Sequence, residues 1–342
     1  MKFSIMFSFV SPPEGPIRHL STFQELDRLL PLAESLGYVG FHTTEHHFQD
    51  NGWAPSPLLV LAKAAGLTKK MRLVTNILVS TLYQPLRLLE DLATLDNLSE
   101  GRLTLGTSPG YVSEEFAAYG VDYERRFGLH EGIIDFLQHG WANPNDIGFS
   151  GRVIKVPSCK LMPQPIQAEL PIWYGVSGPK LLERAAKRRV PVTASPRHTL
   201  PELKDQFACY EEIAQRVGYK PQERPVIREC FVAKTTKQAE ETAGAGVTHL
   251  FGLYGKKSAQ GERALCNDAG ELISDANQVD FRTFASRYVI GNPDVVKEGI
   301  EKIIKELSPS EINLRMQLPG ISTSDFEQSL RLFAEEVMPE FQ

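Results

Sequence analysis

Strand-like and helix-like segments alternate along this chain, and that alternation limits the possible folds more than any other feature of the sequence. Four mostly apolar runs in the first third are predicted as strands, at residues 2–9, 38–43, 71–80 and 103–106. Segments with the three- and four-residue apolar spacing of helices separate them. Because parallel neighbours need such crossovers, we expect a parallel sheet covered by helices.

The same alternation returns in the second half of the chain. Strands are predicted at residues 171–175, 190–194, 225–233 and 312–316. Helices are predicted at residues 23–36, 85–98, 180–188, 201–217, 237–245, 293–306 and 324–337, with a further helix beginning at Pro57. Eight such repeats favour a closed (β/α)8 TIM barrel over an open doubly wound sheet, so the predicted fold class is α/β.

Two segments interrupt the repeats. Residues 141–165 are irregular, and within them residues 148–156 favour a hairpin outside the barrel. Residues 254–280 are polar, contain glycine and show weak periodicity, which is typical of a mobile lid. Since no linker divides the chain, we expect a single domain over residues 1–342 with these insertions.

Composition excludes several classes of partner. The formal net charge of -5 argues against a nucleic-acid partner. No apolar run approaches the roughly 20 residues that span a bilayer, so no membrane partner is expected. The 4 cysteines are far apart and form no C-x-x-C pair. They are typical of free thiols in a reducing compartment, so we expect a cytoplasmic protein.

The segment Glu45-His46-His47-Phe48 follows a predicted strand, and the loops that follow barrel strands carry the chemistry of barrel enzymes. Adjacent residues of an extended segment point to opposite faces. We therefore expect one histidine to face a pocket, while the other packs behind it or meets Glu45. Taken alone, a histidine pair beside a carboxylate is more often a structural cluster than a catalytic pair.

A metal site is the first alternative for this segment. His42 to His46 matches the inverted zinc motif H-x-x-E-H, which requires a helix so that residues four apart share a face. Here the segment continues a strand and contains Thr43 and Thr44, two β-branched residues. We therefore predict no metal site.

Several longer motifs lie in order along the chain. These are EHHF at residues 45–48, QPLRLLEDLATLDNLSEGRLTLG at 84–106, SPGY at 108–111 and VMP at 337–339. The second contains the pattern L-D-x-x-S-x-G-R. Together they resemble the bacterial luciferase-like flavin monooxygenase family, and the resemblance covers essentially the whole chain.

The resemblance implies a (β/α)8 barrel that binds flavin mononucleotide (FMN) at the C-terminal ends of its strands. It implies that a separate NAD(P)H:flavin reductase supplies reduced FMN and that O2 then forms a flavin 4a-hydroperoxide. That species would oxygenate a small, apolar organic substrate in a dry pocket. No GxGxxG fingerprint follows a strand, so the pyridine nucleotide is expected to bind the partner enzyme. The family also implies a homodimer or heterodimer, paired through the second and third barrel helices.

The resemblance also assigns residues. His46 matches the catalytic histidine, as an acid, a base or a hydrogen-bond donor; the alternative is that it only holds its loop through Glu45. For His47 a structural role is favoured. Asn76 and Ile77 occupy the place of a non-prolyl cis peptide beneath the flavin ring. The residues predicted to bind the cofactor are Asn76, Ser108, Tyr111, Arg126, Ser177 and Gly178.

Within that set, Ser177 and Gly178 precede a predicted helix whose amide groups suit the flavin phosphate. Arg126 is a candidate cation for the same phosphate, or an exposed helix arginine. Ser108 and Pro109 replace a cysteine and an arginine found in some members. The substrate pocket is predicted to be lined by Phe7, Phe9, Phe48 and Trp53, with Tyr111 and lid residues.

Two other functions stay open from the sequence. One is an oxidoreductase of the same superfamily that uses the deazaflavin coenzyme F420 for hydride transfer without O2. The other is a non-catalytic flavin-binding subunit. His46 and the predicted lid favour an enzyme, because a carrier has no need to exclude water.

Overall fold

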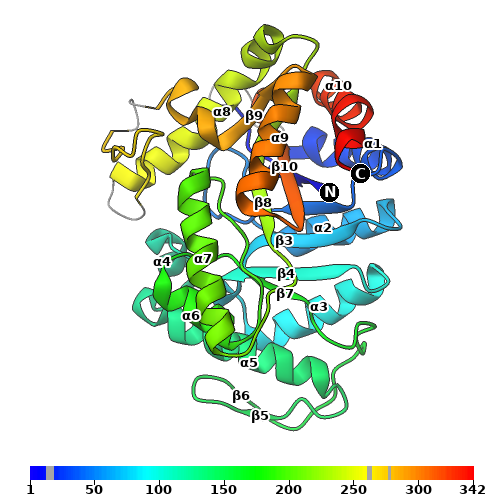
Figure 1. The fold of residues 1–342 in the computed structure, drawn as a ribbon. Helices are drawn as coiled ribbons and strands as arrows, with labels where there is room; N and C mark the ends of the chain where they lie inside the picture. The colour runs from blue at the N-terminus through cyan, green and yellow to red at the C-terminus, as the bar shows by residue number, and fades with distance from the viewer. Residues whose placement is uncertain (13–18, 260–263, 276–278) are drawn as a thin grey trace.

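An eight-stranded parallel sheet forms the centre of the molecule (Figure 1). The computed structural model describes residues 1–12, 19–259, 264–275 and 279–342. The strands are β1 (Lys2–Phe7), β2 (Gly40–Thr43), β3 (Arg72–Val79), β4 (Leu103–Ser108), β7 (Ile172–Tyr174), β8 (Pro225–Val232), β9 (Tyr288–Gly291) and β10 (Glu311–Gln317). Their order is β7-β4-β3-β2-β1-β10-β8-β9.

The ring closes between β7 and β8 through residues 190–194. Val192 forms a single bridge to Tyr174, and the Thr193 amide donates to the Tyr174 carbonyl at 2.9 Å. The Ala194 amide then donates to the Pro225 carbonyl at 3.1 Å. The predicted (β/α)8 barrel is therefore confirmed, although the segment predicted as its sixth strand contributes one bridge and not a full strand.

Helices surround the barrel (Figure 1). They are α1 (His19–Ser35), α2 (Pro57–Leu67), α3 (Pro85–Leu98), α4 (Ser113–Tyr119), α5 (Arg126–Ala142), α6 (Pro179–Lys187), α7 (Leu200–Arg216), α8 (Thr236–Ala259), α9 (Pro293–Leu307) and α10 (Thr323–Leu332). The predicted bounds of α3 agree with the structure. Gln84 explains its start, because its side chain accepts from the Arg87 amide and Pro85 occupies the first helical position.

The predicted hairpin is also present. Strands β5 (Phe149–Ser150) and β6 (Lys155–Val156) pair antiparallel, outside the main sheet. In Figure 1 they lie beyond α5, at the edge of the molecule.

The loop predicted at residues 254–280 is wrong for its first six residues, and its role as a lid stays a prediction. Helix α8 extends to Ala259, so Tyr254 to Ala259 are helical and not loop. The glycines in α8 lower its helix propensity, but packing stabilises it: a Cβ at Gly246 would lie 2.5 Å from the Pro319 carbonyl oxygen, and Phe251 stacks on Phe284 at 4.5 Å. Residues 260–263 and 276–278 of the predicted lid lie outside the described residues.

Strand β9 was not predicted. It pairs with the C-terminal half of β8, with Glu229 opposite Tyr288 and Val232 opposite Gly291. Its four residues follow a polar stretch and are too few to show a periodic apolar pattern.

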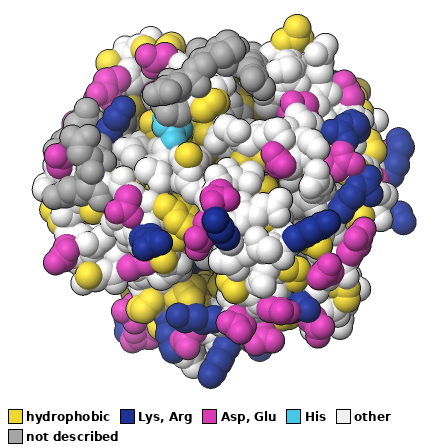
Figure 2. Space-filling model, turned by 90° about the horizontal axis from the view of Figure 1, so that it is seen from above, with side chains coloured by type: hydrophobic (Ala, Val, Ile, Leu, Met, Phe, Trp, Pro, Cys, Tyr) yellow, Lys and Arg dark blue, Asp and Glu magenta, His cyan; other side chains and the backbone are white. Residues whose placement is uncertain are grey.

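The surface carries acidic and basic side chains in alternation. Over the described part of the face in Figure 2, Lys and Arg side chains lie among Asp and Glu side chains, and neither sign forms an extended area. Within residues 1–12, 19–259, 264–275 and 279–342, no helix combines the length and apolar character needed to cross a bilayer.

Candidate active site

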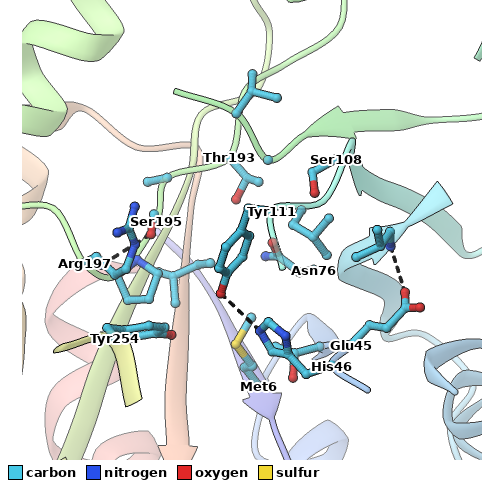
Figure 3. Close-up of a pocket in the computed structure, with 18 of the residues that line it drawn as sticks. Met6, Glu45, His46, Asn76, Ser108, Tyr111, Thr193, Ser195, Arg197 and Tyr254 are labelled. Carbon is cyan, nitrogen blue, oxygen red and sulfur yellow. Dashed lines mark hydrogen bonds between the residues drawn. The ribbon is translucent and has the colours of Figure 1, made fainter. Parts of the chain in front are cut away.

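A cavity opens at the C-terminal ends of the barrel strands, and His46 lies in its wall (Figure 3). It encloses about 890 Å³, part of which is open to solvent. Its lining residues are Met6, Thr44, Glu45, His46, Trp53, Asn76, Ile77, Val79, Ser108, Tyr111, Glu115, Gly175, Val176, Ser177, Thr193, Ala194, Ser195, Pro196, Arg197, Ile227, Tyr254 and Arg315.

The His46 imidazole is held at both nitrogens. Its Nδ1 lies 3.2 Å from the Glu115 carboxylate, and its Nε2 lies 3.4 Å from the Tyr111 hydroxyl (Figure 3). The ring meets Trp53 edge to face at 4.4 Å. Because the Glu115 oxygen also accepts from the His47 amide at 2.9 Å, it acts as an acceptor toward Nδ1–H. Nε2 is therefore the unprotonated nitrogen of the ring, and it accepts from the Tyr111 hydroxyl on the cavity side.

His47 belongs to a separate, buried network. Its Nε2 lies 2.7 Å from the Glu45 carboxylate and its Nδ1 lies 3.0 Å from the Tyr119 hydroxyl. Burial raises the pKa of the Glu45 carboxyl, and hydrogen bonds from His47 and the Val79 amide oppose that rise only in part. The expectation that one histidine faces a pocket while the other meets Glu45 is confirmed.

The side chains of the H-x-x-E-H pattern diverge. His42 contacts Glu311 at 2.9 Å, Glu45 contacts His47, and His46 contacts Glu115. Across the part of the chain that the structure describes, no group of three His, Cys, Asp or Glu residues could hold a metal ion.

Asn76 precedes a cis peptide bond to Ile77, at the position predicted for one. Ile77 packs closely on the neighbouring strands: a Cβ at Gly175 would lie 2.5 Å from its Cγ1. Figure 3 shows Asn76 between Ser108 and His46 in the cavity wall. Its amide nitrogen lies 3.2 Å from His42 Nδ1, and its Oδ1 is buried without a partner.

The other predicted cofactor residues divide into two groups. Ser108, Tyr111 and Ser177 line the cavity. Gly178 does not line it, but it caps the N-terminus of α6, with φ 85° and no atom near its missing Cβ. Arg126 is outside the lining, because its guanidinium donates to the Tyr123 carbonyl at 2.7 Å and stacks on the Tyr123 ring at 3.6 Å.

Three of the four predicted pocket aromatics lie elsewhere. Phe7 is fully buried in the core against Phe41 and Phe326, at 5.6 and 5.3 Å. Phe9 packs on Phe23 at 4.9 Å, and Phe48 is 70% exposed. Only Trp53 lines the cavity, with its indole N–H donating to Thr44 at 2.6 Å. A strand buried on both faces gives no sequence signal for which face meets the cavity.

Two groups of site residues were missed by the sequence analysis. Glu115 lies on α4, a seven-residue helix that no periodic pattern predicted. Arg315 on β10 pairs with Glu229 on β8, and its Nη1 donates to the Tyr254 hydroxyl at 3.2 Å. Burial alone would lower the pKa of Arg315, but Tyr254 and Glu229 raise it above its usual value. Arg315 and Glu229 are register partners, so only the strand pairing brings them together.

A closed parallel barrel with one imidazole held at the mouth of its cavity is the architecture of a barrel enzyme. The family model for luciferase-like monooxygenases matches residues 1–310. The chain therefore belongs to the luciferase-like monooxygenase family.

Named relatives agree with this assignment. The alkanal monooxygenase alpha chain of the Kryptophanaron alfredi symbiont is 25% identical over 99% of this chain and 98% of its own length. The oxygenase component of the flavin-dependent trigonelline monooxygenase from Acinetobacter baylyi is 25% identical over 93% of this chain and 90% of its own length. These relatives support an oxidoreductase.

Solved structures show the same fold. The monooxygenase RslO1 from Streptomyces bottropensis has a TM-score of 0.83, with 25% identity and 100% coverage of both chains. An FMN complex of the oxygenating constituent of 3,6-diketocamphane monooxygenase from Pseudomonas putida has a TM-score of 0.80, with 19% identity over 100% of this chain and 99% of its own.

An F420-dependent tetrahydromethanopterin reductase from Methanopyrus kandleri has a TM-score of 0.70, with 19% identity over 100% of this chain and 99% of its own. At 19% identity, this structure and the FMN complex show the fold alone. Neighbours of this chain thus include both FMN-dependent monooxygenases and F420-dependent enzymes.

Proposed function

We propose that this protein is the oxygenase component of a two-component monooxygenase, which uses reduced FMN and O2 to oxygenate a small organic substrate. The observation that carries the proposal is the His46 imidazole, fixed by Glu115 and Tyr111 with its Nε2 toward the cavity. Such an atom can give or take a proton beside a bound flavin ring. An NAD(P)H:flavin reductase would be the partner, because the similar trigonelline monooxygenase has a separate oxygenase component.

The residues present fit FMN. Asn76 and Thr193 line the cavity, and their buried atoms Oδ1 and Oγ1 have no hydrogen-bond partner. The polar edge of a flavin ring can supply that partner. Ser177 and the open N-terminus of α6 beside Gly178 are suited to the phosphate. When bound, FMN supplies the activation of O2.

The protein's own contribution is to orient groups and exclude water. Trp53 and Tyr111 flank the His46 ring at 4.4 and 5.8 Å, which keeps it in one orientation. Glu115 fixes the proton on Nδ1, and Nε2 then moves a proton at the reacting centre. Val79, Ile77 and Trp53 give the wall apolar surface, which keeps bulk water away from that centre.

Pairing of two subunits is part of the proposal. Leu59 on α2 is 73% exposed and Leu98 on α3 is 56% exposed, and these helices lie side by side. Exposed leucines on adjacent helices are suited to burial against a second subunit, identical or homologous.

The test is a stopped-flow experiment. Protein loaded with reduced FMN under anaerobic conditions is mixed with oxygenated buffer, and the return of oxidised-flavin absorbance and the release of H2O2 are recorded. The wild type should return oxidised flavin more slowly than free FMN, and His46→Ala should abolish that delay. His139→Ala is the matched control, because His139 contacts the Gly148 carbonyl beside the hairpin.

Other outcomes would replace the proposal. A failure to bind FMN, with binding of F420, would favour the hydride-transfer enzyme. Binding of FMN with oxidation as fast as in free solution, unchanged by His46→Ala, would favour a flavin-binding subunit without turnover.

A further inference from the structure

Three buried polar side chains connect the barrel interior to the cavity. Glu311 on β10 lies 2.9 Å from His42 Nε2 on β2, and His42 Nδ1 lies 3.2 Å from the Asn76 amide nitrogen on β3. The Ser4 hydroxyl donates to the same Glu311 oxygen at 2.5 Å. His42, Asn76 and Glu311 are all at most 4% exposed, so their hydrogen bonds are not exchanged with bulk water.

These hydrogen bonds indicate which nitrogen of the His42 imidazole carries the proton. Burial tends to raise the pKa of Glu311, but hydrogen bonds from His42 and Ser4 and the nearby Arg72 hold it below its usual value. Glu311 is therefore an ionised acceptor, so His42 carries its proton on Nε2. In this neutral tautomer Nδ1 accepts, which agrees with the position of the Asn76 amide nitrogen, 3.2 Å from His42 Nδ1.

The consequence appears at the other end of the amide. With its nitrogen directed to His42, Asn76 presents Oδ1, the buried atom that has no partner in the cavity wall. A buried acceptor of this kind is costly unless a ligand donates to it. A ligand with an N–H or O–H group at this point would satisfy it.

We propose that Asn76 Oδ1 accepts a hydrogen bond from the N5–H group of reduced flavin, an inference that rests on the proposed FMN site. Strands β2 and β3 are neighbours, so Asn76 and the loop that carries His46 serve adjacent parts of one ring. Position N5 is next to the ring carbon that reacts with O2, where His46 would act. Oxidised flavin has a lone pair at N5, and a deazaflavin has carbon at position 5, so neither donates an N–H there.

Asn76 thus determines which redox form of the flavin the site prefers, and it discriminates FMN from a deazaflavin. His42 and Glu311 are its positioning residues. One neutral hydrogen bond in a buried site corresponds to roughly a tenfold change in affinity. The site should bind reduced FMN more tightly than oxidised FMN, and more tightly than reduced 5-deaza-FMN.

The test is anaerobic titration of the full-length protein with three probes: oxidised FMN, reduced FMN and reduced 5-deaza-FMN. Asn76→Leu keeps a similar side-chain size and removes the acceptor. We expect this variant to bind reduced FMN about tenfold more weakly, and its affinities for the other two probes to stay nearly unchanged. Glu311→Gln should lower the preference for reduced FMN by disturbing the proton position on His42. The matched control is Asn313→Leu, since Asn313 is buried on β10 and does not line the cavity.

An equal loss of affinity for all three probes in Asn76→Leu would overturn the inference. Equal affinities of the wild type for reduced FMN and reduced 5-deaza-FMN would also overturn it. A preference for oxidised FMN that Asn76→Leu removes would show that the amide presents NH2, which also contradicts it. A wild type that binds no flavin would overturn the proposed function as well. Thermal melts of each variant separate misfolding from lost contacts, and the conservative Glu311→Gln keeps the test informative if Asn76→Leu unfolds.

Discussion

The two halves of the cavity wall are built differently. The half from β2, β3, β4 and β7 carries His46, Asn76, Ser108 and Ser177, each close to a contiguous sequence motif. The half from β8, β10 and α8 carries Arg315 and Tyr254, with Glu229 behind them. In the first half Asn76 Oδ1 is buried without a partner, whereas the charges of Arg315 and Glu229 in the second half neutralise each other.

This difference indicates a division of labour. Groups that await a partner are suited to the cofactor, which is the same in every turnover. An ion pair whose opposite charges cancel gives the opposite wall a neutral surface, which is suited to a substrate that is not an anion. We therefore propose that the cofactor binds the first half and the substrate the second.

The largest effect is expected from breaking the ion pair of the second half. Arg315→Met leaves the Glu229 charge buried and unpaired, which should lower the free energy of unfolding by about 3–5 kcal/mol. Chemical denaturation measures this. The double variant Arg315→Met/Glu229→Leu should regain much of the loss, and the exposed Arg331→Met should change little. Equal losses in Arg315→Met and Arg331→Met would contradict a buried pair.

A smaller effect is expected from Glu115→Gln in the first half. The variant removes a charged hydrogen-bond partner of His46, worth about 1.5–3 kcal/mol, so turnover should fall roughly 10- to 100-fold with FMN affinity kept. Product formation with a panel of aldehydes and ketones gives the rate. Unchanged turnover would show that Glu115 only holds the His47 amide.

Tyr254→Phe should have a milder effect on the second half. It removes a hydroxyl that Arg315 orients toward the cavity, so the KM of a carbonyl substrate should rise about fivefold through loss of one hydrogen bond. The affinity for FMN should stay the same. If FMN affinity falls and KM does not change, the assignment of the two halves is reversed.

The smallest effect is expected from acid titration of Glu311. Its pKa is lowered in the folded protein, so the unfolded chain binds more protons as the pH falls below about 4.5. The stability that Glu311 contributes is present above that pH and is lost as the pH falls through the folded-state pKa. Glu311→Gln should therefore show a shallower loss of stability in acid, measured by thermal melts from pH 6 to pH 3. If the stability of the wild type and of Glu311→Gln falls in parallel with pH, the lowered pKa of Glu311 would be contradicted.

The sequence predicted the barrel because alternation of strands and helices is a local property that survives folding. It predicted His46 through a motif that lies beside a strand end, and the cis peptide at Asn76 through the family resemblance. It failed at Phe7 and Phe9, because a strand buried on both faces shows no alternation that separates core from cavity. It also missed Glu115, on a helix too short for periodicity, and Arg315 with Glu229, whose meeting depends on the pairing of β8 with β10.

The most direct test of the two-sided cavity is the crystal structure of the protein in complex with FMN. We expect the flavin ring within hydrogen-bond distance of Asn76, with His46 beside it and the phosphate at Ser177. A ring that instead lies against Tyr254 and Arg315, with Asn76 and Ser177 uncontacted, would contradict it.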